Sequence, residues 1–561
     1  MKGKTLLIVL ATALLSSARM EACTNVIVTK GASADGSVMV TYSADSHQLY
    51  GECYFSAAGR FAPKTWLEIV EWDSGKRIGQ IAQVPQTYQT VGNMNQYQVT
   101  ITETTFGGRE ELSHQSGASI DYGSLIYITL QRAKSAREAI ETIATLMDEY
   151  GYASAGESFS VADKNEAWIM EIIGKGEGYK GAVWAAARIP DGYICSHANQ
   201  SRIHHIDFAD KENWLYSEDV VDFARTKGYF AGEDKDFSFC DAYNPLDFSG
   251  ARACEARVWS AFNILTDGNF NGRKADEWLD FAMGLDVDGE KMPLYVKATK
   301  PVTFRALADV MRDHYEGTPM DMTADAGAGG HHTPYRWRPM YFQYEGKSYL
   351  NERAIATQQT GFWILCQSRS WLPDVLGGVL WIGMDDAATS ALTPVYTNVK
   401  EVPQPIRVGN GNMITYSETS QFWINNRVAQ FAYLLYDRVA PVVREKILAH
   451  EDGCLEDVKV LEEQALKILG SDPGKKQIDK VRSILTDFSN KKSWELLNTW
   501  KDLDRFLMVK FMDGNVKEQN PDGSFKTIET SATIPTLTQP GYSEQWKRAV
   551  SKDLPEHMIA K

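Results

Sequence analysis

A cysteine stands at the boundary between an apolar leader and the first strand-like segment of the chain. Residues 6–15 are almost entirely apolar, and Cys23 follows a few positions later. If the leader is removed up to Ala22, an α-amino group with a pKa of about 8 lies beside the Cys23 thiol. That amine can accept the thiol proton and return it to a leaving amine. The position predicts an N-terminal cysteine nucleophile, and the alternative is an inert buried thiol.

Residues 1–22 have the features of a secretory signal peptide. Two lysines precede the apolar run, which is far shorter than the roughly 20 residues that span a bilayer. We expect an exported protein, periplasmic or extracellular, without a transmembrane segment. A cut after Ala18 would leave four residues before Cys23, so either the cut is irregular or a short propeptide is removed by autoprocessing. Lipid attachment to Cys23 is the alternative, although Met20-Glu21-Ala22 is a poor lipidation sequence.

Two histidine pairs and a glycine-rich run are candidates for cofactor sites. His204-His205 and His331-His332 accompany no spaced cysteine or glutamate motif of a zinc site, and adjacent histidines point in different directions on a regular element. Gly327-Ala328-Gly329-Gly330 lacks the Lys-Ser/Thr of a phosphate-binding loop. We therefore predict no metal ion and no organic cofactor.

Strands are predicted on both sides of a helical pair, and these elements must position the cysteine. The predicted strands are residues 24–29, 38–43, 67–72, 79–84, 96–102, 158–162, 167–173, 180–188 and 192–197. The clearer helix covers residues 135–150, where Ser135 and Glu138 fit a capping box and apolar residues recur at helical spacing. The order of strands, two helices and strands favours antiparallel sheets with helices outside them.

The second half of the chain is predicted to alternate between helical and strand-rich regions. Residues 214–313 are mainly helical and 316–340 form a loop; strands are predicted at 353–358, 362–366 and 378–384. Helices return beyond residue 417, including a long run over 472–510. We divide the chain into a leader (1–22), a catalytic domain with helical insertions (23–416) and a mainly helical C-terminal region (417–561).

The composition is that of a large folded protein. Of 561 residues, 43% are hydrophobic and 23% charged, which excludes a disordered chain. The net charge of −15 argues against nucleic-acid binding, because phosphate contacts need a basic surface. Seven cysteines are too few for a disulfide scaffold. Disulfide pairing and oligomeric state, including a homo-oligomer, stay open.

Four segments in a fixed order carry a resemblance to a known family. They are Cys23-Thr24-Asn25-Val26-Ile27-Val28 with the later Asp45-Ser46-His47; Gly92-Asn93-Met94-Asn95 leading to Glu103-Thr104-Thr105; Ala162-Asp163-Lys164-Asn165-Glu166-Ala167-Trp168; and Ser196-His197-Ala198-Asn199-Gln200-Ser201-Arg202-Ile203. Together they resemble the C69 family of dipeptidases. That family is a branch of the N-terminal nucleophile hydrolases, related to penicillin V acylases and choloylglycine hydrolases.

The resemblance implies a fold and a set of catalytic roles. The implied fold is α+β, a four-layer αββα sandwich with Cys23 at the end of an inner strand and with helical C-terminal additions. Asp45 matches the carboxylate that binds the α-amino group of the nucleophile. Asn199 matches the side-chain amide of the oxyanion hole, and Asn95 is a second candidate donor. One position departs from the acylase relatives, because Tyr42 stands where they have an arginine close to the nucleophile.

The resemblance implies an exported cysteine-type dipeptidase. Cys23 would attack the peptide carbonyl and form a thioester, which water then hydrolyses. A dipeptidase must also bind the free amine of its substrate, and Glu103 and Glu171 are the candidate carboxylates. Two alternatives stay open: an amidase of the same fold that acts on N-acylated amino acids, and a non-enzymatic, lipid-anchored surface protein.

Overall fold

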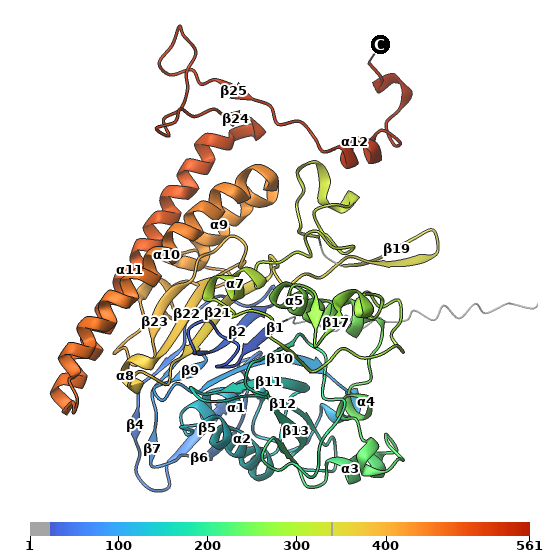
Figure 1. Ribbon diagram of the computed structural model, residues 1–561, viewed down its shortest axis with the longest axis vertical. Helices are drawn as coiled ribbons and strands as arrows, with labels where there is room; N and C mark the ends of the chain where they lie inside the picture. The colour runs from blue at the N-terminus through green and yellow to red at the C-terminus, as the bar shows by residue number, and fades with distance from the viewer. Residues whose placement is uncertain (1–22, 338–339, 561) are drawn as a thin grey trace, which may run out of the picture.

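Two antiparallel β-sheets lie face to face, with helices against their outer faces (Figure 1). The computed structural model describes residues 23–337 and 340–560, so the predicted leader lies outside the described residues. Contacts of β10 with β1 and β2, and of β9 with β22, join the two sheets. The predicted arrangement of stacked antiparallel sheets and external helices is confirmed at this level.

The first sheet has seven strands in the order β18-β14-β1-β2-β21-β22-β23. In chain order they are β1 (Thr24–Val28), β2 (Val38–Asp45), β14 (Tyr193–His197), β18 (Tyr295–Lys297), β21 (Thr360–Ser368), β22 (Gly378–Met384) and β23 (Thr393–Tyr396). Every residue of β1 and β2 is buried, because helices cover one face and the second sheet covers the other.

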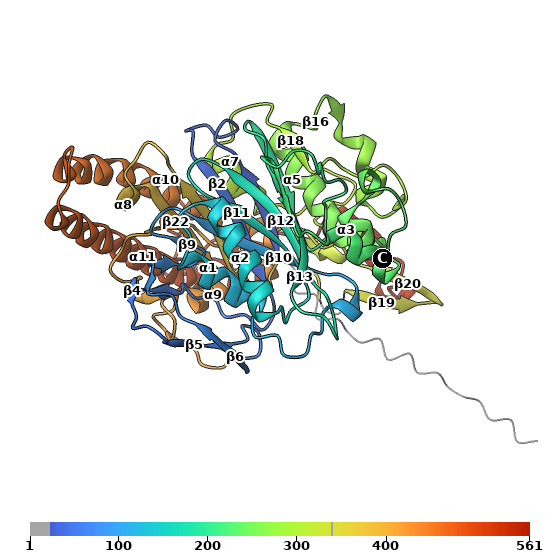
Figure 2. The same cartoon turned by 90° about the horizontal axis from the view of Figure 1, so that it is seen from below.

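The second sheet has eight strands in the order β15-β13-β12-β11-β10-β9-β8-β3. Their bounds are β3 (Phe55–Ser56), β8 (Thr90–Val91), β9 (Met94–Asn95), β10 (Thr100–Gly107), β11 (Gly156–Ala162), β12 (Ala167–Gly174), β13 (Ala182–Arg188) and β15 (Trp214–Tyr216). A separate hairpin, β5 (Trp66–Val70) with β6 (Arg77–Ala82), extends beside this sheet (Figure 2).

Two helices, α1 (Tyr122–Leu130) and α2 (Ala136–Tyr150), cover the second sheet. The predicted boundaries of α2 are confirmed, because the Ser135 hydroxyl accepts from Glu138 N at 3.2 Å and Gly151 ends the helix with a φ of 76°. One apolar face of α2, including Ile140, Ile143 and Met147, is completely buried against the sheet.

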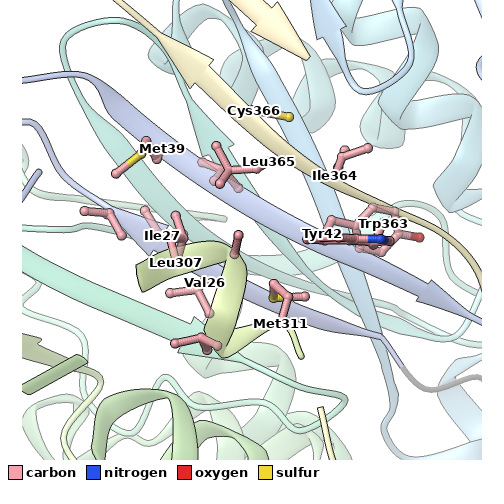
Figure 3. Close-up of a cluster of buried hydrophobic side chains, with 14 of the residues drawn as sticks. Val26, Ile27, Met39, Tyr42, Leu307, Met311, Trp363, Ile364, Leu365 and Cys366 are labelled. Atoms are coloured by element: carbon pink, nitrogen blue, oxygen red, sulfur yellow. The ribbon is translucent and has the colours of Figure 1, made fainter. Parts of the chain in front are cut away.

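The outer face of the first sheet is covered by helices from later in the chain. These are α5 (Ala256–Thr266), α7 (Phe304–Val310), α9 (Gln421–Leu434), α10 (Tyr436–Leu469) and α11 (Lys475–Phe511). Leu307 and Met311 lie in one buried cluster with Val26 and Ile27 of β1 (Figure 3). Because α11 packs on β23, the long C-terminal helices belong to the core of this sheet (Figure 1).

The interface between the two sheets contains hydrogen-bonded polar side chains as well as apolar ones. Asn25 of β1 donates to the carbonyl of Glu103 in β10 at 2.6 Å. His197 of β14 bonds Thr104 at 2.7 Å and Ser160 at 2.8 Å through its two ring nitrogens. Burial lowers the pKa of His197 to about 3, so the ring is neutral in this network. These bonds align β1 with β10.

Several predicted elements differ from the observed ones. Residues 353–358 form no strand, because Arg353 turns its side chain to Asp45 and the chain enters the sheet only at Thr360. The strand predicted over 96–102 begins at Thr100, after a turn. The long C-terminal helices end at Phe511, and the described residues after it form the strand pair β24–β25, one short α-helix and two single turns of 3₁₀-helix.

The remaining elements are short. They are β4 (Gly59–Arg60), β7 (Gln86–Thr87), α3 (Val220–Lys227), α4 (Phe239–Tyr243), β16 (Asn269–Phe270), β17 (Arg273–Lys274), α6 (Leu279–Ala282), β19 (Tyr341–Tyr344), β20 (Lys347–Leu350), α8 (Asp374–Gly377), β24 (Val516–Lys517), β25 (Leu537–Thr538) and α12 (Glu544–Val550), with single turns of other helix types between them. In the described part of the chain, every helix is too short or too polar to cross a membrane.

Candidate active site

Cys23 lies at the wall of a cavity of about 380 Å³. The residue immediately precedes β1 and is only 5% exposed. The end of β2, the loop after it, α1 and the turn of the β5–β6 hairpin complete the wall, with Tyr42, Asp45, Trp72, Asn93, Glu103, Tyr122, Tyr127 and Phe362 among its side chains. The thiol is thus buried in the fold but faces a space that a small molecule can occupy.

The sulfur of Cys23 faces a carboxylate and a phenol. The thiol lies 3.6 Å from Glu103 Oε1 and 3.9 Å from Tyr42 Oη, and the Tyr42 hydroxyl donates to the same Glu103 oxygen at 2.5 Å. Burial, followed by the charges of Cys23 and Glu103, raises the pKa of Tyr42 well above its ordinary value. Tyr42 therefore stays protonated and acts as a hydrogen-bond donor to Glu103.

The main-chain nitrogen of Cys23 donates to Asn199 Oδ1 at 2.8 Å. Asn199 follows β14 with a φ of 62°, a left-handed conformation that asparagine tolerates better than most residues. Its Nδ2 donates to the carbonyl of Thr105 at 2.7 Å. The oxygen of this amide, rather than the nitrogen predicted to serve an oxyanion hole, is thus turned toward the nucleophile.

A completely buried arginine holds Cys23 and Asn199 together. Arg257 lies at the start of α5, and its guanidinium donates to Cys23 O at 2.6 Å and to Asn199 Oδ1 at 3.0 Å. Its other N–H groups donate to Ala198 O, Ala253 O and Thr24 Oγ1. All five donors of the guanidinium are therefore used, which compensates its burial.

Asp45 ends β2 at a bulge against β21. Its carboxylate accepts from Arg353 at 2.7 Å and from the Thr360 hydroxyl at 2.6 Å, and the ion pair with Arg353 is almost fully buried. The bulge places the carboxylate in the wall of the same cavity as Cys23. Its predicted role toward the α-amino group of Cys23 stays a prediction.

A second buried carboxyl group, Glu157 of β11, lies beside Glu103. Burial and the Glu103 charge raise the pKa of Glu157 well above its ordinary value, while a hydrogen bond from Thr105 at 2.9 Å opposes the shift. Two buried carboxyl groups this close cannot both ionise readily, so Glu157 retains its proton and leaves the charge to Glu103.

The geometry corrects two of the predicted site residues. Asn95 is fully buried, and its amide donates to Leu130 O and Ala133 O while accepting from Tyr97 N and Val99 N. Because a side-chain amide has two donor protons and two acceptor lone pairs, no capacity remains for an oxyanion. The neighbouring Asn93 lines the cavity instead.

Glu171 lies outside the lining of the cavity. Its carboxylate accepts from the Ser201 hydroxyl and from the main-chain nitrogens of Arg202 and Ile203. Burial raises the pKa of Glu171 to about 7. These contacts hold the segment after Asn199, so the position of Glu171 supports a structural role rather than the predicted substrate contact.

Three aromatic rings that contact one another form part of the cavity wall. Trp72, from the hairpin turn, lies 4.7 Å from the ring of Tyr54 and 4.9 Å from that of Tyr127. Next to Trp72, Asp73 accepts from the Tyr122 hydroxyl at 2.8 Å. Sequence reasoning missed all of these residues, because they come from three separate segments.

The histidine pairs lie outside this cavity. Among the described residues, one group could hold a metal ion: His204, Cys240 and Asp241 bring their ligand atoms within 4.8 Å of one another. All seven cysteines are described, and all are buried free thiols.

Comparison with known proteins identifies the family of this chain. A sequence model of peptidase family C69 matches residues 62–448. The chain belongs to peptidase family C69. The matched range contains Glu103, Asn199 and Arg257 and begins after Cys23 and Asp45.

Relatives of this C69 protein are 23–26% identical to it over the aligned residues. A "Probable dipeptidase" of Salmonella dublin is 26% identical over 409 residues, which cover 70% of this chain and 84% of the relative. "Dipeptidase A" of Lactobacillus helveticus is 23% identical over 454 residues, covering 76% of this chain and 86% of the relative. A "Dipeptidase" of Bifidobacterium longum (strain NCC 2705) is 23% identical over 427 residues, which cover 68% of this chain and 72% of the relative. These similarities support peptidase activity.

Replacing Glu157 by glutamine should weaken the pH dependence of stability. The raised pKa of Glu157 means that the folded protein keeps this proton where the unfolded chain has lost it. The contribution of Glu157 to the free energy of unfolding should therefore fall as the pH rises above about 4, the ordinary glutamate range. Glu157→Gln cannot ionise but keeps a donor and an acceptor, so it should lack this part of the pH dependence. Between pH 4 and 8 its free energy of unfolding in urea should decrease less with pH than that of the wild type.

The matched control is Glu463→Gln, which changes an exposed glutamate of α10. Its stability should follow the pH in the same way as that of the wild type. An unchanged slope in Glu157→Gln would contradict a retained proton at Glu157.

Proposed function

We propose that this C69 peptidase is a dipeptidase whose nucleophile is the thiol of Cys23. The observation that carries the proposal is the position of that thiol at the wall of a cavity of about 380 Å³, 3.6 Å from the Glu103 carboxylate. Removal of residues 1–22 would convert the main-chain nitrogen of Cys23, which lies beside Asn199 Oδ1, from an amide into an amine. Only then can it act as a base, because an amide nitrogen does not accept a proton.

The proposed reaction uses one residue for attack and proton transfer. The α-amine of Cys23 takes the thiol proton, and Sγ adds to the peptide carbonyl. The resulting ammonium protonates the leaving amino acid as the C–N bond breaks, and water then hydrolyses the thioester. Asn199 Oδ1 and Arg257 orient this amine and the Cys23 carbonyl. Main-chain N–H groups and the Asn199 amide are the candidates for stabilising the oxyanion.

Glu103 is well placed to bind the free amine of a dipeptide. The nitrogen of an amino acid lies about 2.5 Å from its own carbonyl carbon, given standard bond lengths. A sulfur poised for attack lies about 3–3.5 Å from that carbon. The substrate amine is therefore held within about 6 Å of Sγ, the region where Glu103 Oε1 lies at 3.6 Å. An ionised Glu103 would pair with the ammonium there.

The charge of the cavity favours a dipeptide over an N-acylated substrate. Among the described residues, its lining includes the acidic side chains of Asp45, Asp73 and Glu103 and no lysine, arginine or histidine. An acylated nitrogen carries no charge and cannot form an ion pair with Glu103. The amidase alternative therefore fits this cavity less well.

We further propose that the stacked sheets and their helices form the αββα sandwich of N-terminal nucleophile hydrolases. Cys23 directly before an inner strand supports this assignment. We also propose that the protein is exported to the periplasm or the medium and that its leader is removed up to Ala22. The signal-like composition of residues 1–22 supports this route.

Cys23→Ala should lose activity by about 10³-fold or more on a panel of dipeptides, because the nucleophile is gone. Cys23→Ser should also be severely impaired. The wild type treated with a metal chelator should keep its activity. Full activity in Cys23→Ala would refute the nucleophile, and loss of wild-type activity on chelation would indicate a required metal.

The intact mass of the active protein should correspond to residues 23–561. This mass is expected because catalysis requires a free amine on Cys23. An active protein that begins at Arg19 would contradict the proposed processing. A lipid on Cys23 would instead support the surface-protein alternative, because acylation blocks the amine.

Glu103→Gln should reduce kcat/KM for free dipeptides by about 10²-fold, within the range of about 2–5 kcal/mol for loss of one partner of a buried ion pair. For N-acetylated dipeptides, which lack the cation, the reduction in kcat/KM should be much smaller. The matched control is Glu68→Gln, whose exposed carboxylate pairs with Arg77 on the neighbouring hairpin. Equal losses on free and acetylated substrates would show that Glu103 does not bind the amine.

A further inference from the structure

A second cavity lies directly behind the aromatic wall of the Cys23 cavity. It has a volume of about 500 Å³, and Cys53, Phe55, Gln131, Val402 and Arg407 are among its lining residues. The two cavities share three lining residues, Tyr54, Trp72 and Tyr127. Their rings contact one another pairwise, with centroids 4.7–5.7 Å apart. These three side chains therefore form a common partition between the two spaces.

Of the three rings in the partition, Trp72 is held by the smallest number of secondary-structure elements. Tyr54 lies between the buried Cys53 and the second sheet, and Tyr127 belongs to α1, whereas Trp72 projects from the turn of the isolated β5–β6 hairpin. Its main-chain nitrogen donates to Asp121 Oδ2 at 2.9 Å. Gly123 permits the close approach, since a Cβ there would lie 2.6 Å from Trp72 Cβ. The neighbouring Asp73–Tyr122 hydrogen bond also holds the turn against α1.

We infer that Trp72 sets the size of the substrate's N-terminal residue by closing the Cys23 cavity against the second one. This inference rests on the proposed dipeptidase function, in which Glu103 binds the substrate amine. With the amine held beside the sulfur, the side chain on the same α-carbon extends into the rest of the cavity, which ends at the rings. Dipeptides whose first side chain is longer than the cavity are then excluded by the indole.

Removal of the indole should join the two cavities without touching the reacting groups. The lining of the second cavity includes the apolar and aromatic side chains of Phe55, Val402 and Val408 as well as the ion pair of Arg407 with Glu401. It would therefore accept an extended apolar or aromatic group. Each added methylene that fits such a space changes discrimination by about 10-fold or more, so a ring-sized extension should give a readily measured effect.

The test compares two series of dipeptides, X-Ala and Ala-X, in which X is alanine, phenylalanine or 4-phenylphenylalanine. The wild type should hydrolyse the X-Ala dipeptide poorly when X is 4-phenylphenylalanine. In Trp72→Ala, kcat/KM for this substrate relative to Ala-Ala should rise by about tenfold or more. In Trp72→Phe, which preserves an aromatic packing partner, this kcat/KM ratio should rise by a smaller factor. Trp66→Ala removes an exposed tryptophan of the same hairpin and should leave the ratio unchanged.

Each outcome decides a different part of the inference. An unchanged ratio in both Trp72 variants, with the rate of Cys23 alkylation by iodoacetamide as in the wild type, would overturn the partition. A rise confined to the Ala-X series would overturn the assignment of the N-terminal residue to this wall. The double variant Cys23→Ala/Trp72→Ala tests the nucleophile separately. Hydrolysis that persists in this double variant refutes the proposed nucleophile, whereas the size ratio in the single Trp72 variants still reports on Trp72.

Discussion

The burial of one guanidinium group determines the geometry of the candidate active site. Arg257 has no contact with solvent, and a charged group in that position is tolerated only when its donors are all satisfied. Its acceptors come from three parts of the chain: the start of β1, the turn after β14 and the turn before α5. The hydrogen bonds that satisfy the donors of Arg257 therefore hold Cys23 and Asn199 in fixed positions relative to each other.

A second constraint aligns the two sheets. Cys23 belongs to the first sheet and Glu103 to the second, so their proximity depends on how the sheets are stacked. Apolar packing alone tolerates small shifts, whereas hydrogen bonds of Asn25 and His197 across the interface are directional. The neutral state of His197 keeps this interface free of a buried positive charge. The thiol and the carboxylate are thus brought together by hydrogen bonds of other side chains. Apart from the Cys23–Glu103 contact itself, neither of the two side chains takes part in this network.

Charge and shape are divided between the two ends of the cavity. At the sulfur end, Glu157 retains a proton, so one carboxylate charge beside Cys23 is available to a cationic substrate. At the other end, the rings of Tyr54, Trp72 and Tyr127 offer an apolar boundary. A small molecule with a free ammonium and an adjacent apolar side chain matches both ends. That is the chemistry of the N-terminal half of a dipeptide.

Local patterns in the sequence determined the position of Cys23 before β1, the succession of strands and helices along the chain and the boundaries of α2, because periodicity and capping act over a few residues. The motif order likewise indicated family C69. Only the tertiary structure decided which buried polar groups face each other. Asn95 and Asn93 are two positions apart, yet one satisfies a turn and the other lines the cavity. Arg257 and Trp72 acquire their positions from contacts over long sequence separations, which no local pattern records.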